Sequence, residues 1–171
     1  MENKLYILCG IPFSGKTTLA KKLVEKLGFT RIDLDDIKFE LFGKDIMDPQ
    51  IDQTGWDKVF RQMYREIKQS LAHGKTVVHD TGNFTFHERS LVKHIADELG
   101  LESITIFVDI PEKEAHKRLI ENRQTKTRFD VVDEDFQSSV NEMEPPGNDE
   151  RHLIFNWKDN VDKWVENYLA H

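Results

Sequence analysis

One segment near the start of the chain constrains the fold more than any other: Gly10-Ile11-Pro12-Phe13-Ser14-Gly15-Lys16-Thr17. It matches the pattern G-x-x-x-x-G-K-[ST] at every fixed position. The apolar residues 5–9 before it are typical of a short buried strand, and residues 18–27 after it are typical of a helix. A strand, a glycine-containing turn and a helix in this order are the context in which the pattern binds phosphate.

The residue types in this segment suit an anionic ligand. Glycines tolerate backbone conformations that a Cβ atom forbids, so successive N–H groups can converge on phosphate oxygens at the positive end of the following helix. Lys16 is expected to neutralise the β- and γ-phosphates of a nucleotide, and the Thr17 hydroxyl to ligate Mg²⁺. The predicted nucleotide site includes Gly10, Ile11, Pro12, Phe13, Ser14, Gly15, Lys16, Thr17 and Thr18.

Size and composition limit the function classes. The 171 residues predict one domain, 1–171, and the net charge of −7 argues against a protein that binds a nucleic-acid backbone over a broad surface. We expect no membrane-spanning segment and no signal peptide, because there is no long apolar run and no basic N-terminal region. Cys9 is the only cysteine, which excludes intramolecular disulfides and favours a cytoplasmic protein.

Short apolar segments alternate with longer amphipathic ones along the chain. Strands are expected at residues 4–9, 29–34, 76–80, 103–108 and 152–155. Helices are expected at 15–27, 36–42, 56–73, 84–99, 111–122, 133–143 and 158–169. This alternation predicts a three-layer α/β/α fold with a five-stranded parallel sheet, whose ligands bind at the carboxyl ends of the strands.

Asp35 follows the second expected strand and is the predicted catalytic base. The first helix rises about 21 Å at roughly 1.5 Å per residue, and the strand returns about 20 Å. The chain therefore comes back to the edge that holds the glycine-containing turn, where a carboxylate can take the proton of an acceptor hydroxyl. Asp35 could equally cap the following helix. Asp33 is the reserve candidate, and Lys38 is expected to contact an anionic group of the acceptor or solvent.

A third apolar strand ends in Asp80, which is the pattern of a carboxylate that holds Mg²⁺. Asp80 and Thr17 are therefore the predicted metal ligands, although Asp80 could instead be a turn residue. Asp80, Thr81 and Asn83 are expected at the acceptor. His79 alternates away from Asp80 and is interpreted as a packed or surface histidine.

Residues 123–131 are polar and basic and lie between two expected helices. We interpret them as a short lid that brings arginines over the nucleotide. Arg123 is the preferred lid arginine for the transition state, whose charge spreads over the γ-phosphoryl oxygens. Arg118 and Arg128 are further predicted nucleotide contacts. The alternative is that the segment is a solvated run of charge.

With these residues in place, the chain resembles the P-loop kinase superfamily, and within it the small AAA-type ATP-binding kinases related to the kinase domain of phage polynucleotide kinase. The matching segments are GIPFSGKTTLA at 10–20, RIDLDD at 31–36, VVHDTGNF at 77–84, RLIENR at 118–123 and MEPP at 143–146. The resemblance implies the sheet order 2-3-1-4-5, ATP with Mg²⁺, and transfer of the γ-phosphate to a hydroxyl. It also places Asp35 where the polynucleotide kinases have their general base.

The sequence departs from that family at three positions. Phe13 replaces a glycine that is common in the loop, and Gly82 is inserted before Asn83. Lys38 stands where polynucleotide kinases have an arginine that grips a nucleic-acid phosphate, and lysine lacks the bidentate fork of arginine. Together with the acidic composition, this favours a small-molecule or nucleoside/nucleotide acceptor. A polynucleotide 5′-hydroxyl kinase and a nucleotide-dependent switch that binds a protein partner are the alternatives.

Overall fold

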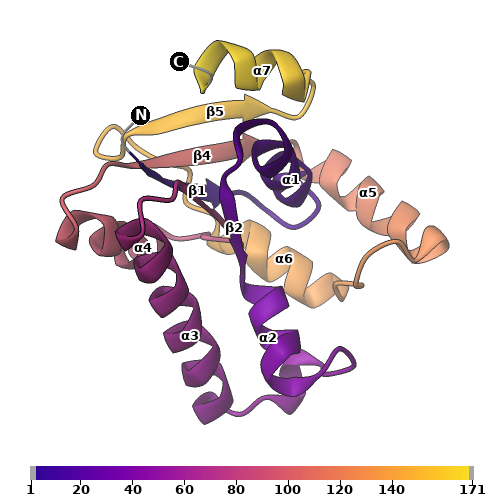
Figure 1. Ribbon diagram of the computed structural model, residues 1–171. Coiled ribbons are helices and arrows are strands. Elements are labelled where there is room, and N and C mark those ends of the chain that lie inside the picture. Colours follow the sequence, from indigo (N-terminus) through magenta and orange to yellow (C-terminus); the bar gives the residue numbers. More distant parts are fainter. Residues whose placement is uncertain (1–2, 170–171) are drawn as a thin grey trace.

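The computed structural model describes residues 3–169 (Figure 1). Five parallel strands form one sheet in the order β2-β3-β1-β4-β5, which confirms the predicted fold. The strands are β1 (Leu5–Cys9), β2 (Thr30–Asp33), β3 (Val77–Asp80), β4 (Ser103–Asp109) and β5 (His152–Asn156). Parallel strands need crossover connections, and the helices between them supply these.

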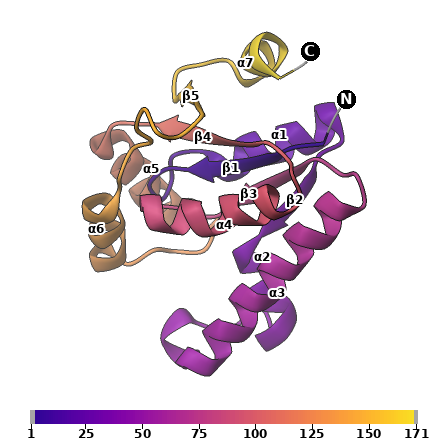
Figure 2. The same ribbon diagram turned by 90° about the vertical axis from the view of Figure 1, so that its left-hand side faces the viewer.

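Helices cover both faces of the sheet. They are α1 (Lys16–Leu27), α2 (Leu34–Phe42), α3 (Gln53–Ala72), α4 (Phe86–Glu98), α5 (Glu112–Thr125), α6 (Asp133–Glu142) and α7 (Val161–Tyr168), with a short 3₁₀ turn η1 (Asp48–Gln50). Figure 2 shows α1 and α7 on one side of the strands and α3 and α4 on the other. No helix within residues 3–169 has the length and apolar character needed to cross a bilayer.

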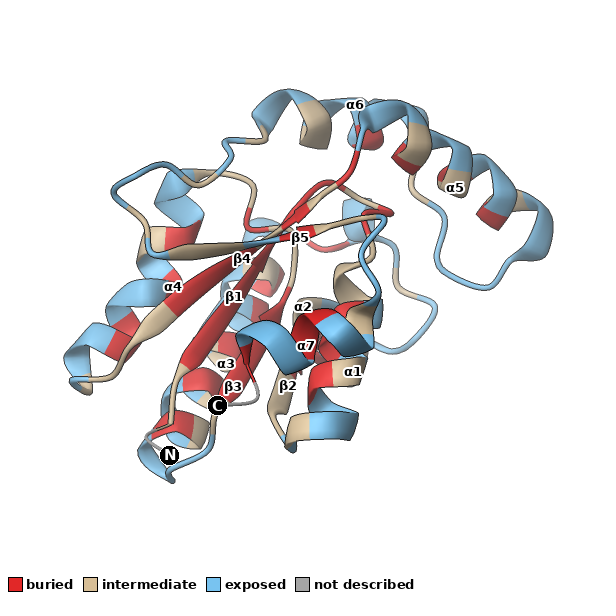
Figure 3. Ribbon diagram, turned by 90° about the horizontal axis from the view of Figure 1, so that it is seen from above, coloured by how far each residue is buried: buried red, intermediate tan, exposed pale blue. Residues whose placement is uncertain are grey.

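The core follows the alternation of side chains along each strand. In β1, Tyr6 and Leu8 pack with α1 and α7, whereas Leu5 and Ile7 pack with α3 and α4. All five residues of β1 are buried, as expected for the central strand of a covered parallel sheet (Figure 3). A third cluster joins Phe13 to Leu119 of α5 and Phe136 of α6 at the carboxyl end of the sheet.

Four helices begin two or three residues from the predicted positions, and each of the four begins after a capping residue. The Asp33 side chain accepts a hydrogen bond from the N–H of Asp35, so α2 starts at Leu34 rather than at residue 36. In the same way Asp52, Thr85 and Asn160 cap α3, α4 and α7. At the other end, α5 extends to Thr125, three residues beyond the predicted end.

The strand register brings the candidate residues together. Asp33 and Asp80 are paired at the last position of β2 and β3, and the glycine-containing loop leaves β1 beside them. Acidic side chains from separate parts of the sequence therefore meet at one edge of the sheet, as the sequence predicted.

Candidate active site

The loop between β1 and α1 has an unusual backbone. A Cβ atom at Gly10 would lie 2.9 Å from the carbonyl oxygen of Val108, so no larger residue fits without displacement of β4. Phe13 adopts a left-handed conformation with φ of 63°, and Gly15 has φ of 112°. The Phe13 side chain is 5% exposed and belongs to the third core cluster. Burial of this ring holds the loop in a conformation that side-chain-bearing residues disfavour.

Lys16 folds back into this loop. Its Nζ donates to the carbonyl oxygens of Gly10, at 2.7 Å, and of Ile11, at 2.9 Å. Burial lowers the pKa of Lys16 to about 8, and the nearby Asp80 carboxylate opposes part of this effect. The ammonium is held where an anion bound in the loop would meet it.

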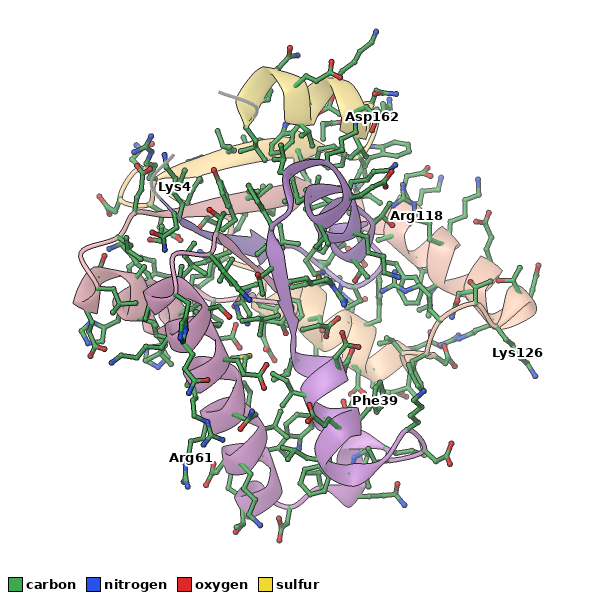
Figure 4. The ribbon with its side chains drawn as sticks, viewed as in Figure 1. Lys4, Phe39, Arg61, Arg118, Lys126 and Asp162 are labelled. Atoms are coloured by element: carbon green, nitrogen blue, oxygen red, sulfur yellow. The ribbon has the colours of Figure 1, made fainter. Side chains whose placement is uncertain are left out.

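Arg118 of α5 supports the loop from outside. Its guanidinium donates to the carbonyl oxygens of Phe13 and Ser14, at 3.2 and 3.1 Å, and lies over the Trp157 ring at 5.9 Å from the centroid. Figure 4 shows Arg118 projecting from α5 toward α1. Arg118, which was predicted to contact the nucleotide, thus lies at the loop and donates to its backbone carbonyl oxygens.

Arg31 organises the carboxylates at the end of the sheet, and sequence reasoning missed it. Its Nε donates to Asp80 at 2.7 Å, and its other nitrogens form ion pairs with Asp36, at 2.8 Å, and with Asp33. The available signal was its position two residues before Asp33 in a strand, because residues two apart share a face.

Asp35 lies in the first turn of α2 and lines the cleft above the loop. Asp33 is the residue that caps α2, so the Asp35 carboxylate does not serve as the helix cap. Lys38 donates to Asp35 at 2.8 Å and to Asp48 at 2.7 Å, and Lys38 is only 6% exposed. Burial alone would lower the pKa of Lys38, but the hydrogen bonds to Asp35 and Asp48 raise it. Lys38 therefore carries a charge that two carboxylates already neutralise.

Thr17 and Asp80 fit a magnesium ion. The Thr17 hydroxyl lies 3.5 Å from Oδ1 of Asp80, and Oδ2 of Asp80 is held by Arg31. Mg²⁺ is commonly bound through one or two carboxylates together with substrate phosphates and water. Residues 3–169 contain no group of three or more His, Cys, Asp or Glu side chains that could hold a metal ion by themselves.

Arg128 is the lid arginine that reaches the cleft. Its guanidinium lies over the Phe13 ring at 4.9 Å from the centroid, and it lines the cleft. Asn122 holds this segment: its Oδ1 accepts from the N–H of Arg128 at 2.9 Å and from the Thr127 hydroxyl at 3.1 Å. Asn122 is 5% exposed and was not singled out from the sequence.

Arg123, the lid arginine preferred in the sequence analysis, has its contacts away from the cleft in this structure. Its guanidinium forms ion pairs with Asp130 and Asp133, both at 3.0 Å, and donates to the carbonyl oxygen of Val131. Arg123 is not among the residues that line the cleft, whereas Arg128 is. The acidic residues that follow the basic segment bind Arg123, so it ties the lid to the start of α6.

The cleft has a volume of about 380 Å³. Phe39 of α2 and Phe129 of the lid meet across it, with ring centroids 4.7 Å apart. In Figure 4, Phe39 projects from α2, and Lys126 marks the outer end of α5. Lys21 of α1 also lines the cleft and was not predicted, whereas Thr18 is exposed and does not line it.

Two polar residues after β3 have different surroundings. Thr81 lines the cleft, as predicted for an acceptor contact. Asn83 does not line it: its side chain is 5% exposed, and its amide donates to the carbonyl oxygen of Leu8 at 2.7 Å. His79 is fully buried between Asn83 and Met63, and burial lowers its pKa to about 3. Asn83 and His79 therefore support the fold behind the cleft.

A parallel sheet in the order 2-3-1-4-5, with a phosphate-type loop after its central strand, defines the P-loop kinase fold. The profile of the AAA domain family AAA_33 matches residues 5–146, and the chain belongs to that family.

Individual relatives agree with this assignment. The chain is 29% identical over 120 residues to the shikimate kinase of Synechococcus elongatus, a match that covers 66% of this chain and 55% of that relative. It thus spans about half the length of this curated relative. A putative kinase from Chloroflexus aurantiacus has a similar structure, with a TM-score of 0.72, 18% identity, and coverage of 99% of this chain and 100% of the other. A chain of the Pnkp1/Rnl/Hen1 RNA repair complex has a similar structure, with a TM-score of 0.71 and 22% identity. The match covers 83% of this chain and 44% of the other.

Proposed function

We propose that this protein is an ATP-dependent kinase that transfers the γ-phosphate to a hydroxyl of a small-molecule or nucleoside/nucleotide acceptor. One observation carries the proposal: Lys16, Thr17, Asp35 and Asp80 line a single cleft. Phosphoryl transfer to a hydroxyl needs a phosphate-binding loop next to a carboxylate that can accept the hydroxyl proton, and Asp35 stands beside the loop in this cleft. The kinases among the relatives support the same reaction class.

Each residue has a defined role in this proposal. The amides of residues 11–17 and Lys16 hold the β- and γ-phosphates, and Asp35 accepts the proton of the attacking hydroxyl. Thr17 and Asp80 would hold Mg²⁺, which supplies positive charge beside the phosphates. Arg128 contacts the γ-phosphoryl oxygens as charge spreads over them. Arg31 is a positioning residue, because it fixes Asp80 without lining the cleft.

The polynucleotide 5′-hydroxyl kinase is the weaker candidate. Lys38 stands where polynucleotide kinases have a phosphate-gripping arginine. In this structure Lys38 is buried and already paired with Asp35 and Asp48. An additional nucleic-acid phosphate would have to displace one of these carboxylates. A nucleotide-dependent switch that binds a protein partner fits this site less well than either kinase. A general base such as Asp35 suits the activation of an acceptor hydroxyl better than the slow hydrolysis expected of a switch.

The test is ADP release from ATP and Mg²⁺ in the presence of alcohols, sugars, nucleosides and oligonucleotides. We expect Asp35→Asn to retain ATP affinity and to lose at least about 100-fold in kcat, because a general base contributes at the transition state. Lys16→Ala should abolish transfer. Glu40→Gln is the matched control, because Glu40 is an exposed carboxylate of the same helix and does not line the cleft. Turnover near the wild-type rate in Asp35→Asn would overturn the assignment of the base, and undiminished turnover in Lys16→Ala would overturn the kinase proposal.

A further inference from the structure

A second cavity adjoins the cleft and takes no part in the nucleotide site. It has a volume of about 150 Å³ and lies where α2, α3 and α4 meet the end of β3. Leu34, Thr81, Gly82 and Phe84 line both spaces. A molecule in the cavity can therefore extend into the cleft beside Asp35.

The walls of this cavity are mainly aromatic and apolar. Phe60 and Tyr64 of α3 contribute adjacent rings, with centroids 6.2 Å apart, and Leu34, Met63, Phe84 and Val92 add apolar surface. The polar residues of the lining are His79, Thr81, Asn83 and Glu88. A cavity of roughly this size holds one six-membered ring. The Phe84 ring keeps its position only because residue 82 is glycine: a Cβ there would lie 2.4 Å from the Phe84 ring. The inserted Gly82 thus shapes the cavity.

Charges are segregated along the combined space. The cations that line it, Lys16, Lys21 and Arg128, lie on α1 and the lid, on the nucleotide side. Among residues 3–169, the charged side chains that line the opposite side are carboxylates: the four aspartates of the cleft, which are Asp33, Asp35, Asp36 and Asp80, and Glu88 at the second cavity. His79 also lines the second cavity, and burial lowers its pKa to about 3, so it is neutral there. Within the described part of the chain, no lysine or arginine lines the second cavity.

Two cations of β2 and α2, Arg31 and Lys38, are already engaged in ion pairs. Lys38 pairs with Asp35 and Asp48, and Arg31 pairs with the carboxylates of β2, α2 and β3. Along that side of the space an anionic acceptor would meet like charges, and no lysine or arginine of the described residues lines the second cavity to offset them, which costs binding free energy. A neutral or cationic acceptor meets complementary surroundings.

We propose that this second cavity binds the ring of the phosphate acceptor, and that the acceptor is a hydroxylated ring compound, neutral or cationic, without a phosphate or carboxylate group. This inference rests on the proposed function, because it names the acceptor of that same transfer. The acceptor oxygen forms a bond to the γ-phosphorus, the bond from that phosphorus to the β–γ bridging oxygen breaks, ADP leaves, and the hydroxyl proton passes to Asp35.

Three matched probes test the charge preference: benzyl alcohol, 4-(aminomethyl)benzyl alcohol and 4-(hydroxymethyl)benzoate. They share one ring and one primary hydroxyl and differ in charge. Their binding to the protein saturated with ADP and Mg²⁺ is measured by ligand-observed NMR and calorimetry. We expect the anion to bind at least roughly tenfold more weakly than the neutral and cationic probes. Equal or tighter binding of the anion would overturn the proposal.

Two variants locate the binding. Phe60→Ala should weaken binding of the neutral probe about 3- to 10-fold through loss of the aromatic contact. Glu88→Gln, which preserves the capping box of α4, should reduce the advantage of the cation. Phe86→Ala is the matched control, since this aromatic residue of α4 is 52% exposed and lies outside the cavity. Unchanged probe binding in Phe60→Ala would also contradict the assignment.

The outcomes separate this inference from the proposed function. If ADP binds and none of the three probes does, the second cavity is not the acceptor site and only this inference fails. If the wild-type protein binds no ADP with Mg²⁺, the nucleotide site itself is wrong and the proposed function fails.

Discussion

Phe13 shows at the scale of one residue how the loop and the lid depend on each other. Its left-handed backbone costs about 1–2 kcal/mol relative to an ordinary conformation. The ring is nevertheless buried and lies under the Arg128 guanidinium. A glycine would remove the strain and also the surface on which the lid arginine rests. The contacts of the Phe13 ring with the core and with Arg128 therefore offset the strain of its backbone.

We predict that Phe13→Leu weakens ATP binding by about 3- to 10-fold, because a cation–π contact contributes roughly 0.5–1 kcal/mol or more. Leucine keeps most of the buried apolar volume, so the free energy of unfolding should fall by less than about 1.5 kcal/mol. Calorimetric titration with a non-hydrolysable ATP analogue measures the first effect and urea unfolding the second. Wild-type affinity in this variant would mean that Arg128 acts without the ring.

Lys16 makes nucleotide binding depend on pH. Its pKa in the free protein is lowered to about 8, and bound phosphates favour the charged form and raise it. Below about pH 8 the ammonium is already protonated and binding needs no proton. Above that pH, binding takes up a proton, so ADP affinity should fall by up to about tenfold per pH unit. Calorimetry in buffers of different ionisation enthalpy measures this proton uptake, and Lys16→Arg should abolish it. Constant affinity up to about pH 9.5 would contradict the lowered pKa.

At the scale of elements, the lid depends on one buried amide. Asn122 is the last buried residue of α5. Its side-chain oxygen accepts from the N–H of Arg128 at 2.9 Å, and its side-chain nitrogen donates to the carbonyl oxygen of Arg128 at 3.1 Å. This arrangement fixes the direction in which the chain leaves the helix, and so places Arg128 over the loop.

We predict that Asn122→Ala costs about 1–3 kcal/mol in the free energy of unfolding, because buried backbone groups lose their partners. ATP turnover should fall by about tenfold or more as Arg128 loses its position. Hydrogen exchange of residues 126–131 should accelerate. Gln124→Ala, an exposed residue of the same helix, is the control. Unchanged exchange in Asn122→Ala would show that other contacts hold the lid.

Much of the arrangement of elements was accessible from the sequence, and the details that were missed have local causes. The 2-3-1-4-5 order, implied by the family resemblance, is confirmed. Helix starts were misplaced at α2 and α3 because apolar periodicity was weighed above the capping residues Asp33 and Asp52. The sequence alone could not show that Arg128 and not Arg123 lines the cleft, because this depends on which arginine the neighbouring aspartates bind. Such competition is settled by three-dimensional contacts.

At the scale of the whole molecule, a buried ion pair joins two segments that lie far apart in the sequence. Arg89 of α4 is 2% exposed, donates to both oxygens of Glu150 at 2.7 Å, and also binds the carbonyl oxygens of Asn83 and Phe84. It connects α4 to the segment that precedes β5 and supports the turn after β3. The pair therefore links the two halves of the chain behind the cleft.

We predict that Arg89→Met lowers the free energy of unfolding by about 3–5 kcal/mol, because it leaves the Glu150 carboxylate buried without a partner. Urea unfolding measures the loss. The double change Arg89→Met with Glu150→Leu should recover part of it, since no charge is then left uncompensated. Lys93→Met, which breaks an exposed pair with Asp97 on the same helix, should cost less than about 1 kcal/mol. A small loss in Arg89→Met would show that Glu150 reaches water.

The contact between Arg118 and Trp157 offers a spectroscopic consequence. The same guanidinium touches the indole and the carbonyls of the phosphate-type loop, so any shift of the loop alters the electric field at that indole. Of the three tryptophans in the sequence, Trp56 lies on α3 and Trp164 on α7, whereas Trp157 adjoins the loop. A chain that keeps only this indole would report occupancy through its own fluorescence, without an attached dye.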